Sequence, residues 1–140
     1  MPGARLIAGV FQLDRQLAND CVVVTDLELC RVLLMNDKRY PWLVLVPRVH
    51  GLVELSDLDR AGQHRLLDEI DLADTALRQL GSFDKLNIAS LGNVVAQLHF
   101  HVIARRIGDD AWPAPVWGRG IAQPYEDATR MVAQLRRELG

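Results

Sequence analysis

The chain has 140 residues, the usual size of one domain built around a single hydrophobic core. Hydrophobic residues make up 49% and charged residues 24% of the sequence, a balance that excludes an intrinsically disordered chain. Lys and Arg number 16 against 18 Asp and Glu, so the formal charge is −2 and there is no electrostatic reason to expect a general nucleic-acid binder. We therefore expect one domain over residues 1–140 that binds no nucleic acid.

Targeting signals and cysteine content indicate the compartment. Residues 1–10 hold too short an apolar stretch for a secretory signal, and the longest apolar run elsewhere is well below the roughly 18 residues of a membrane span. Only two cysteines occur, Cys21 and Cys30, and both lie in apolar runs, as is typical of free thiols in a reducing compartment. These features predict a cytoplasmic protein that does not enter a membrane.

Three short apolar runs in the first third of the chain predict strands, over residues 21–24, 29–35 and 42–46. Each run is bounded by residues that favour turns. Pro47 ends the third run, because proline has no N–H to donate to a sheet.

A helix is expected next, from Ser56 as N-cap, with Asp59 at the third helical position, to Gly81 just past the end. Between them, apolar side chains follow one another at steps of four and three residues and form one stripe. His64 falls on the other side of this helix and is expected to face water.

The last part of the chain predicts two more strands, a loop and a helix. The strands cover residues 85–90 and 94–103, and the Gly-, Trp- and Pro-rich segment 108–118 is typical of an ordered, irregular loop. An amphipathic helix is expected from Pro124 or Tyr125 to Leu139. The order of these elements favours the α+β class: an antiparallel sheet of about five strands with one main helix packed on it and a C-terminal loop plus helix.

The segment 97–103 holds the side chains with the clearest chemistry. Successive side chains of a strand point to opposite faces, so Gln97, His99 and His101 are expected on one face and the apolar residues between them on the other. Two imidazoles and an amide are costly to bury without partners, so this face is expected to line a wet cleft. A stiff strand would hold a nucleophile at a fixed distance from its target.

This segment resembles the signature of the histidine triad family, His-φ-His-φ-His-φ-φ with φ apolar, with Gln97 in the first place. Residues 92–96 resemble the Gly-Gln-x-Val-x that precedes the triad, and residues 42–50 resemble an apolar strand that ends in Pro-basic-x-His. The resemblance implies a HIT-like fold with a core over about residues 10–106 and a C-terminal extension over residues 107–140.

The resemblance implies a nucleotide hydrolase or nucleotidyl transferase that attacks an α-phosphate, for example in a dinucleoside polyphosphate or a phosphoramidate. His99 is then the nucleophile that forms a nucleotidyl-imidazole intermediate, and His101 binds a phosphate oxygen and, when protonated, stabilises the leaving group. Asn87 and Asn93 would donate hydrogen bonds to the phosphate. Gln97 cannot exchange a proton near neutral pH, so leaving-group protonation departs from the family scheme. No metal or other cofactor takes part.

The resemblance also implies where the rest of a nucleotide binds. In the family an acidic residue after an early strand binds the ribose, and Asn36 or Asp37 has that place here, with a plain turn as the alternative. His50 either belongs to the site or is an exposed loop histidine. Trp112 and the proline after it resemble a pair that reaches across a homodimer into the partner's site, the alternative being a tail packed on its own subunit.

Three other interpretations stay open. A His-x-His pair on a strand can bind zinc or iron, although no Asp or Glu lies within five residues of this pair. A protein that binds nucleotides without turning them over could keep the same fold, with Gln97 in place of a reactive group. A polar strand with a purely structural role is the third interpretation.

Overall fold

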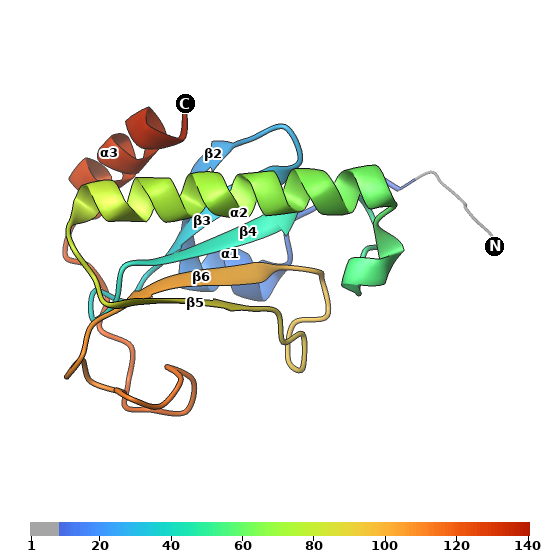
Figure 1. Cartoon of the computed structure of the whole chain (residues 1–140). Coiled ribbons are helices and arrows are strands. Elements are labelled where there is room, and N and C mark those ends of the chain that lie inside the picture. The colour runs from blue at the N-terminus through green and yellow to red at the C-terminus, as the bar shows by residue number, and fades with distance from the viewer. Residues whose placement is uncertain (1–8) are drawn as a thin grey trace.

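The computed structural model describes residues 9–140, so most of the stretch 1–10, expected to be no secretory signal, lies outside the described residues. Its centre is a five-stranded antiparallel sheet in the order β2–β3–β4–β6–β5 (Figure 1). The strands are β2 (Cys21–Asp26), β3 (Cys30–Met35), β4 (Trp42–Pro47), β5 (Lys85–Ala89) and β6 (Phe100–Arg105). Strand β6 lies between β4 and β5, which places the end of the histidine motif in the interior of the sheet.

In the described part of the chain, three α-helices and one 3₁₀ turn accompany the sheet: α1 (Arg15–Asp20), η1 (Leu55–Asp57), α2 (Arg60–Leu80) and α3 (Thr129–Leu139). Helix α2 runs lengthwise across one face of the sheet, and α3 lies beside its C-terminal end (Figure 1). The predicted α+β class with one main helix is therefore confirmed. Within residues 9–140, none of the helices combines the length and the apolar composition needed to cross a membrane.

Both faces of the sheet are covered by apolar side chains. On one face, Leu66, Ile70 and Leu77 of α2 pack with β-strand residues and α3, as the apolar stripe predicts. On the other face a second cluster joins Leu17 of α1 and Val116 of the C-terminal loop to the sheet. Fully burying one such side chain contributes about 1.5–3 kcal/mol, so the sheet is a firm support for whatever projects from it.

Two predicted helix starts were wrong by several residues. The main helix begins at Arg60, because Asp59 and not Ser56 is its N-cap and accepts a hydrogen bond from the Gly62 N–H at 2.8 Å. The last helix begins at Thr129 and not near residue 124. At residue 125 the backbone N–H donates to the Asn36 side chain in the turn after β3, at 2.9 Å, and no helix is formed there.

The predicted strand over residues 94–103 was also too long, since β6 begins only at Phe100. Gly92 has a positive φ of 75° and turns the chain before the motif. The Leu98 N–H then donates to the Leu52 carbonyl at 3.0 Å, outside the sheet ladder. His99 is consequently the last loop residue, and His101 is the second residue of the strand.

Candidate active site

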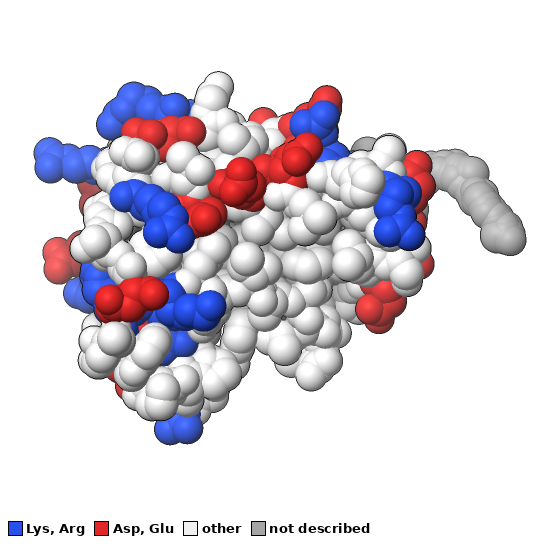
Figure 2. All heavy atoms as spheres, viewed as in Figure 1, with Lys and Arg blue, Asp and Glu red and all other residues white. Residues whose placement is uncertain are grey.

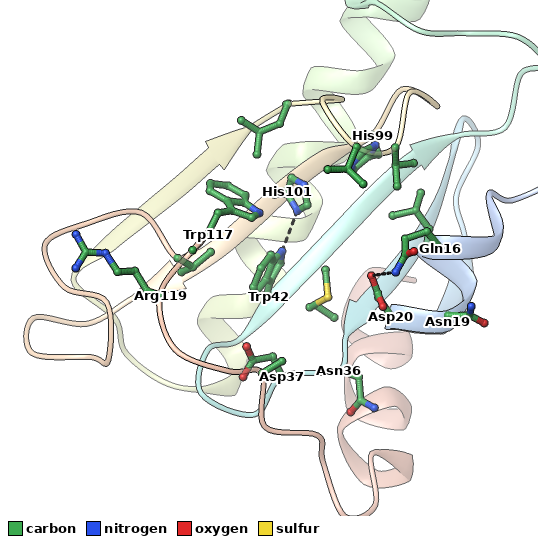
Figure 3. Close-up of a pocket in the computed structure, with 18 of the residues that line it drawn as sticks. Gln16, Asn19, Asp20, Asn36, Asp37, Trp42, His99, His101, Trp117 and Arg119 are labelled. Atoms are coloured by element: carbon green, nitrogen blue, oxygen red, sulfur yellow. Dashed lines mark hydrogen bonds between the residues drawn. The ribbon is translucent and has the colours of Figure 1, made fainter.

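A pocket of about 920 Å³ lies on the face of the sheet opposite to α2. Four segments line it: α1, the turn after β3, the loop of residues 91–95 before β6, and the C-terminal loop around residues 116–124. His99 and His101 lie between α1 on one side and Trp117 of the C-terminal loop on the other (Figure 3). The sheet therefore presents two imidazoles to a pocket with mostly apolar walls.

The ring of His99 is held by the backbone two residues before it. Its Nδ1 lies 2.6 Å from the Gln97 carbonyl oxygen, and the residue is 5% exposed. A carbonyl can only accept, so Nδ1 carries the hydrogen, and in the neutral ring the lone pair is on Nε2. In this tautomer the nitrogen that can act as a nucleophile is Nε2.

The ring of His101 is enclosed by aromatic rings. Its ring centroid lies 5.0 Å from that of His99, 5.0 Å from that of Trp117 and 5.6 Å from that of Trp42, each pair edge to face. The indole N–H of Trp42 donates to Nδ1 of His101 at 3.0 Å. Burial, together with the nearby His99, lowers the pKa of His101 to about 4, so this ring is neutral at physiological pH.

Strand alternation does not place Gln97, because β6 begins after it, and Gln97 lines a smaller hollow of about 280 Å³ together with His99. It precedes β6 and lies outside the residues that line the pocket. Its Oε1 accepts from the Asp14 N–H at 2.8 Å, and its Nε2 donates to the Gln12 carbonyl at 2.9 Å. The Asp14 side chain in turn caps α1 by accepting from the Gln16 N–H, so Gln97 anchors the wall of the pocket that α1 forms.

Asn36 and Asp37 do line the pocket, in the turn after β3. Asp37 is 1% exposed and forms an ion pair with Arg39 at 2.8 Å. Burial acts to raise the pKa of Asp37, but hydrogen bonds from Arg39 and from the Gln123 N–H outweigh it, and the pKa lies below its ordinary value. Asn36 accepts from the Tyr125 N–H at 2.9 Å. Both side chains therefore tie the C-terminal loop to this turn.

Three other predicted residues lie outside the pocket. Asn87 on β5 accepts a hydrogen bond from Arg105 at 2.9 Å. The ring of Trp112 stacks on the same guanidinium at 5.6 Å, within its own chain. His50 is exposed and lines a separate hollow of about 320 Å³ together with Gln97. Of the predicted site residues, the structure brings together His99, His101, Asn93, Asn36 and Asp37 in one pocket.

Several pocket residues were missed by the sequence analysis. They are the aromatic pair Trp42 and Trp117, the charged residues Asp20, Arg39 and Arg119, and the amides Gln16 and Asn19. Helix α1 has six residues, too few for a recognisable apolar period. Trp117 could have been found only from its position as a tryptophan inside an ordered, Pro-rich loop. Within residues 9–140, no three His, Cys, Asp or Glu side chains come together in a group that could hold a metal ion.

The comparisons with known proteins agree with this geometry. The HIT domain matches residues 16–108 of the chain. A histidine triad protein from Bradyrhizobium japonicum has the same fold, with a TM-score of 0.89 and 45% identity over 94% of this chain and 100% of that chain. A histidine triad protein from Marinobacter aquaeolei gives a TM-score of 0.89 and 45% identity, with coverage of 94% and 97%. A third, from Sinorhizobium meliloti, gives 0.87 and 42%, with coverage of 91% and 96%.

Among curated proteins, no sequence is significantly similar to this chain. Its relationship to known proteins therefore rests on the domain match, the solved structures and the histidine pair in the pocket. The match spans well over half of the 140 residues and includes both histidines. The chain belongs to the histidine triad (HIT) family.

Proposed function

We propose that this protein is a nucleotide hydrolase or nucleotidyl transferase that attacks an α-phosphate through Nε2 of His99. The observation that carries the proposal is the 2.6 Å contact of His99 Nδ1 with the Gln97 carbonyl beside a pocket of about 920 Å³. That contact fixes the ring and leaves the opposite nitrogen as the nucleophile. Membership of a family of nucleotide-binding proteins, hydrolases and transferases supports it.

The proposed reaction has two steps. In the first, the lone pair of His99 Nε2 forms a bond to phosphorus, and the bond from phosphorus to the leaving group breaks, so that the leaving group takes the electron pair. The nucleotidyl-imidazole keeps its hydrogen on Nδ1, where the Gln97 carbonyl accepts it and stabilises the positive ring. In the second step, water or another acceptor attacks phosphorus and the bond to Nε2 breaks.

Other pocket residues are proposed to bind the nucleotide. His101 donates to a phosphate oxygen, and Asn93 donates from the loop before β6. Asn36 is proposed to bind the ribose, from the turn that lines the other end of the pocket (Figure 3), and Asp37 is proposed to hold that turn through its ion pair with Arg39. The roles inferred for Asn87, His50 and Trp112 stay predictions, since these three lie outside the pocket of a single chain.

The test is to trap the intermediate with a labelled adenylyl substrate, rapid quenching and mass analysis of the acid-labile label. We expect the label on His99, and we expect His99→Ala to lose turnover by on the order of 10⁴-fold or more while it still binds nucleotide. His64→Ala is the matched control, because His64 is exposed on α2 on the other face of the sheet.

Unchanged turnover in His99→Ala would remove the nucleophile assignment. Binding of a nucleoside monophosphate by the wild-type protein, without label or turnover of any adenylyl substrate, would instead identify a non-catalytic nucleotide-binding member of the family. That second candidate has one structural observation in its favour. The first place of the triad is filled by an amide whose two polar atoms both bond to backbone groups.

We further propose that the protein is a homodimer. Strand β5 is an edge of the sheet, and Ile88 on it is 50% exposed. Figure 2 shows a continuous uncharged area below α2, where β5, β6 and the loop before β6 lie. An edge strand beside an apolar surface is a template for pairing, and a second copy of the chain would cover both at once.

We also propose a cytoplasmic location, which the state of the two cysteine thiols supports. Cys21 and Cys30 are both free, and Cys30 is buried. Burial raises the pKa of Cys21 to about 12 and raises that of Cys30 also, so both stay protonated and unreactive at neutral pH. Unpaired thiols of this kind are typical of a reducing compartment.

A further inference from the structure

The hydrogen bond from Trp42 to His101 determines where the proton of His101 lies. The indole Nε1 lies 3.0 Å from Nδ1, and the two residues are 6% and 5% exposed. An indole N–H can only donate, so Nδ1 of His101 must accept. The neutral ring therefore carries its hydrogen on Nε2.

The same contact opposes a charged His101. A protonated ring carries hydrogens on both nitrogens, and its Nδ1–H would then face the indole N–H, donor against donor. The ring lies edge to face with those of His99, Trp42 and Trp117, and the ladder partners of His101 are the uncharged Val44 on β4 and Ala89 on β5. The carboxylates that line the pocket bond elsewhere, Asp37 to Arg39 and Asp20 to Gln16. The other charged side chain that lines the pocket is the cation Arg119.

Neither of the other two side chains in the motif is available as an acid. The Nδ1–H of His99 donates a hydrogen bond to the Gln97 carbonyl. Both polar atoms of the Gln97 side chain bond to backbone groups of Asp14 and Gln12, and an amide does not ionise near neutral pH. His99 is therefore the nucleophile and His101 a neutral hydrogen-bond donor, and none of the three side chains supplies an acid.

We propose that Trp42 is a positioning residue that holds His101 in its Nε2–H form, and that the site consequently takes nucleotidyl substrates whose leaving group departs as a weakly basic anion. A phosphate, a nucleoside polyphosphate or a carboxylate leaves with the electron pair of the broken bond to phosphorus and needs no proton. An alkylamine would have to leave as an amide anion unless an acid protonated it first. The substrate class rests on the proposed function, whereas the tautomer does not.

The tautomer is tested by heteronuclear NMR of isotope-labelled histidine in the intact protein, from about pH 5 to pH 8. We expect a neutral His101 with an unprotonated Nδ1 over this whole range. In Trp42→Phe, which keeps an aromatic ring but has no N–H, a measurable Nδ1–H population is expected. Trp117→Phe is the matched control: it removes an indole N–H from the other ring against His101 and should leave the tautomer unchanged.

Two NMR results would overturn the positioning role. One is a wild-type His101 that carries its hydrogen on Nδ1 or is charged at neutral pH. The other is a Trp42→Phe variant whose tautomer is the same as that of the wild type. The wild-type spectrum alone can refute the assignment, so the test stands even where the variant folds poorly.

The substrate class is tested by comparing diadenosine triphosphate with the N-propyl phosphoramidate of adenosine monophosphate. We expect kcat/KM to be higher for the anhydride by about 10²–10⁴-fold, the usual contribution of a general acid. Equal values would show that the site does protonate leaving groups and would refute the proposed class. No turnover of either substrate, with the tautomer as expected, would count against the proposed function and the substrate class but leave the role of Trp42 intact.

Discussion

Gln97 begins the segment that resembles the histidine triad signature, and in the structure its side chain connects two distant parts of the backbone. Its amide joins the loop before β6 to the backbone of residues 12–14, and Asp14 is the N-cap of α1. A six-residue helix has little stability of its own, so tertiary contacts must hold it. Because Leu17 and Asp20 of α1 line the pocket, an amide outside the pocket helps to shape it.

Gln97→Glu tests this connection with a side chain of nearly the same shape. A carboxylate can accept from the Asp14 N–H but cannot donate to the Gln12 carbonyl, and the two oxygens then repel each other. We expect a loss of about 1–3 kcal/mol in the free energy of unfolding and a higher KM with a smaller change in kcat. Denaturant titration and steady-state kinetics measure the two effects.

Gln79→Glu is the control for the added charge, since Gln79 is exposed on α2, against the opposite face of the sheet. A variant Gln97→Glu with wild-type stability and KM would show that α1 stays in place without the amide.

Helix α2 is fastened to the sheet by one buried carboxylate as well as by its apolar stripe. Glu69 is 1% exposed, and its two oxygens accept from the N–H groups of Leu29 and Cys30, each at 2.8 Å. These two N–H groups lie where the chain enters β3 and need partners once they are buried. Helix and strand therefore complete each other's hydrogen bonding.

Glu69→Gln is expected to destabilise the fold by about 1–3 kcal/mol, because one N–H of the turn then faces an NH₂ group and stays unsatisfied. The measurement is the midpoint and slope of urea unfolding followed by circular dichroism. Asp71→Asn on the exposed side of the same helix is the control and should change stability by less than about 0.5 kcal/mol. Equal stability of the two variants would contradict this role for Glu69.

The assembled molecule leaves one edge of its sheet open. Among residues 9–140, strand β2 has α1 and α3 beside it, whereas β5 has β6 as its one strand neighbour. The proposed dimer explains why Ile88 and the uncharged area around it remain at the surface of a chain of this size (Figure 2). Dimerisation through this edge would also place the loops before β6 of the two subunits near the shared interface.

Ile88→Glu is expected to weaken the dimer about tenfold or more, because association would bury a charge at the edge strand. Sedimentation equilibrium across a range of concentrations measures the change. Ile107→Glu is the control, since Ile107 is 70% exposed in the turn after β6. A wild-type protein that is monomeric at all concentrations, or equal dissociation constants for the two variants, would refute the dimer interface.

Local patterns were enough for four of the five strands, for the body of the main helix and for the histidine pair. Alternation, apolar periodicity and turn residues act between near neighbours, so residues 85–89 and the stripe that includes Leu66 and Leu77 could be predicted from the sequence. The His-x-His spacing was likewise visible without a structure. The family was predicted from the same segments, and the HIT domain match over residues 16–108 confirms it.

Contacts between distant segments decided the rest. Gln97 bonds to residues more than eighty positions away, Trp42 reaches His101 across the sheet, and the C-terminal loop brings Trp117 to the pocket. No local pattern encodes such pairs, because the two residues of each pair come into contact only when the strands have paired in the folded sheet. The sequence thus predicted which side chains are candidates for chemistry, and tertiary packing alone determined the neighbours of each histidine and the nitrogen that carries its hydrogen.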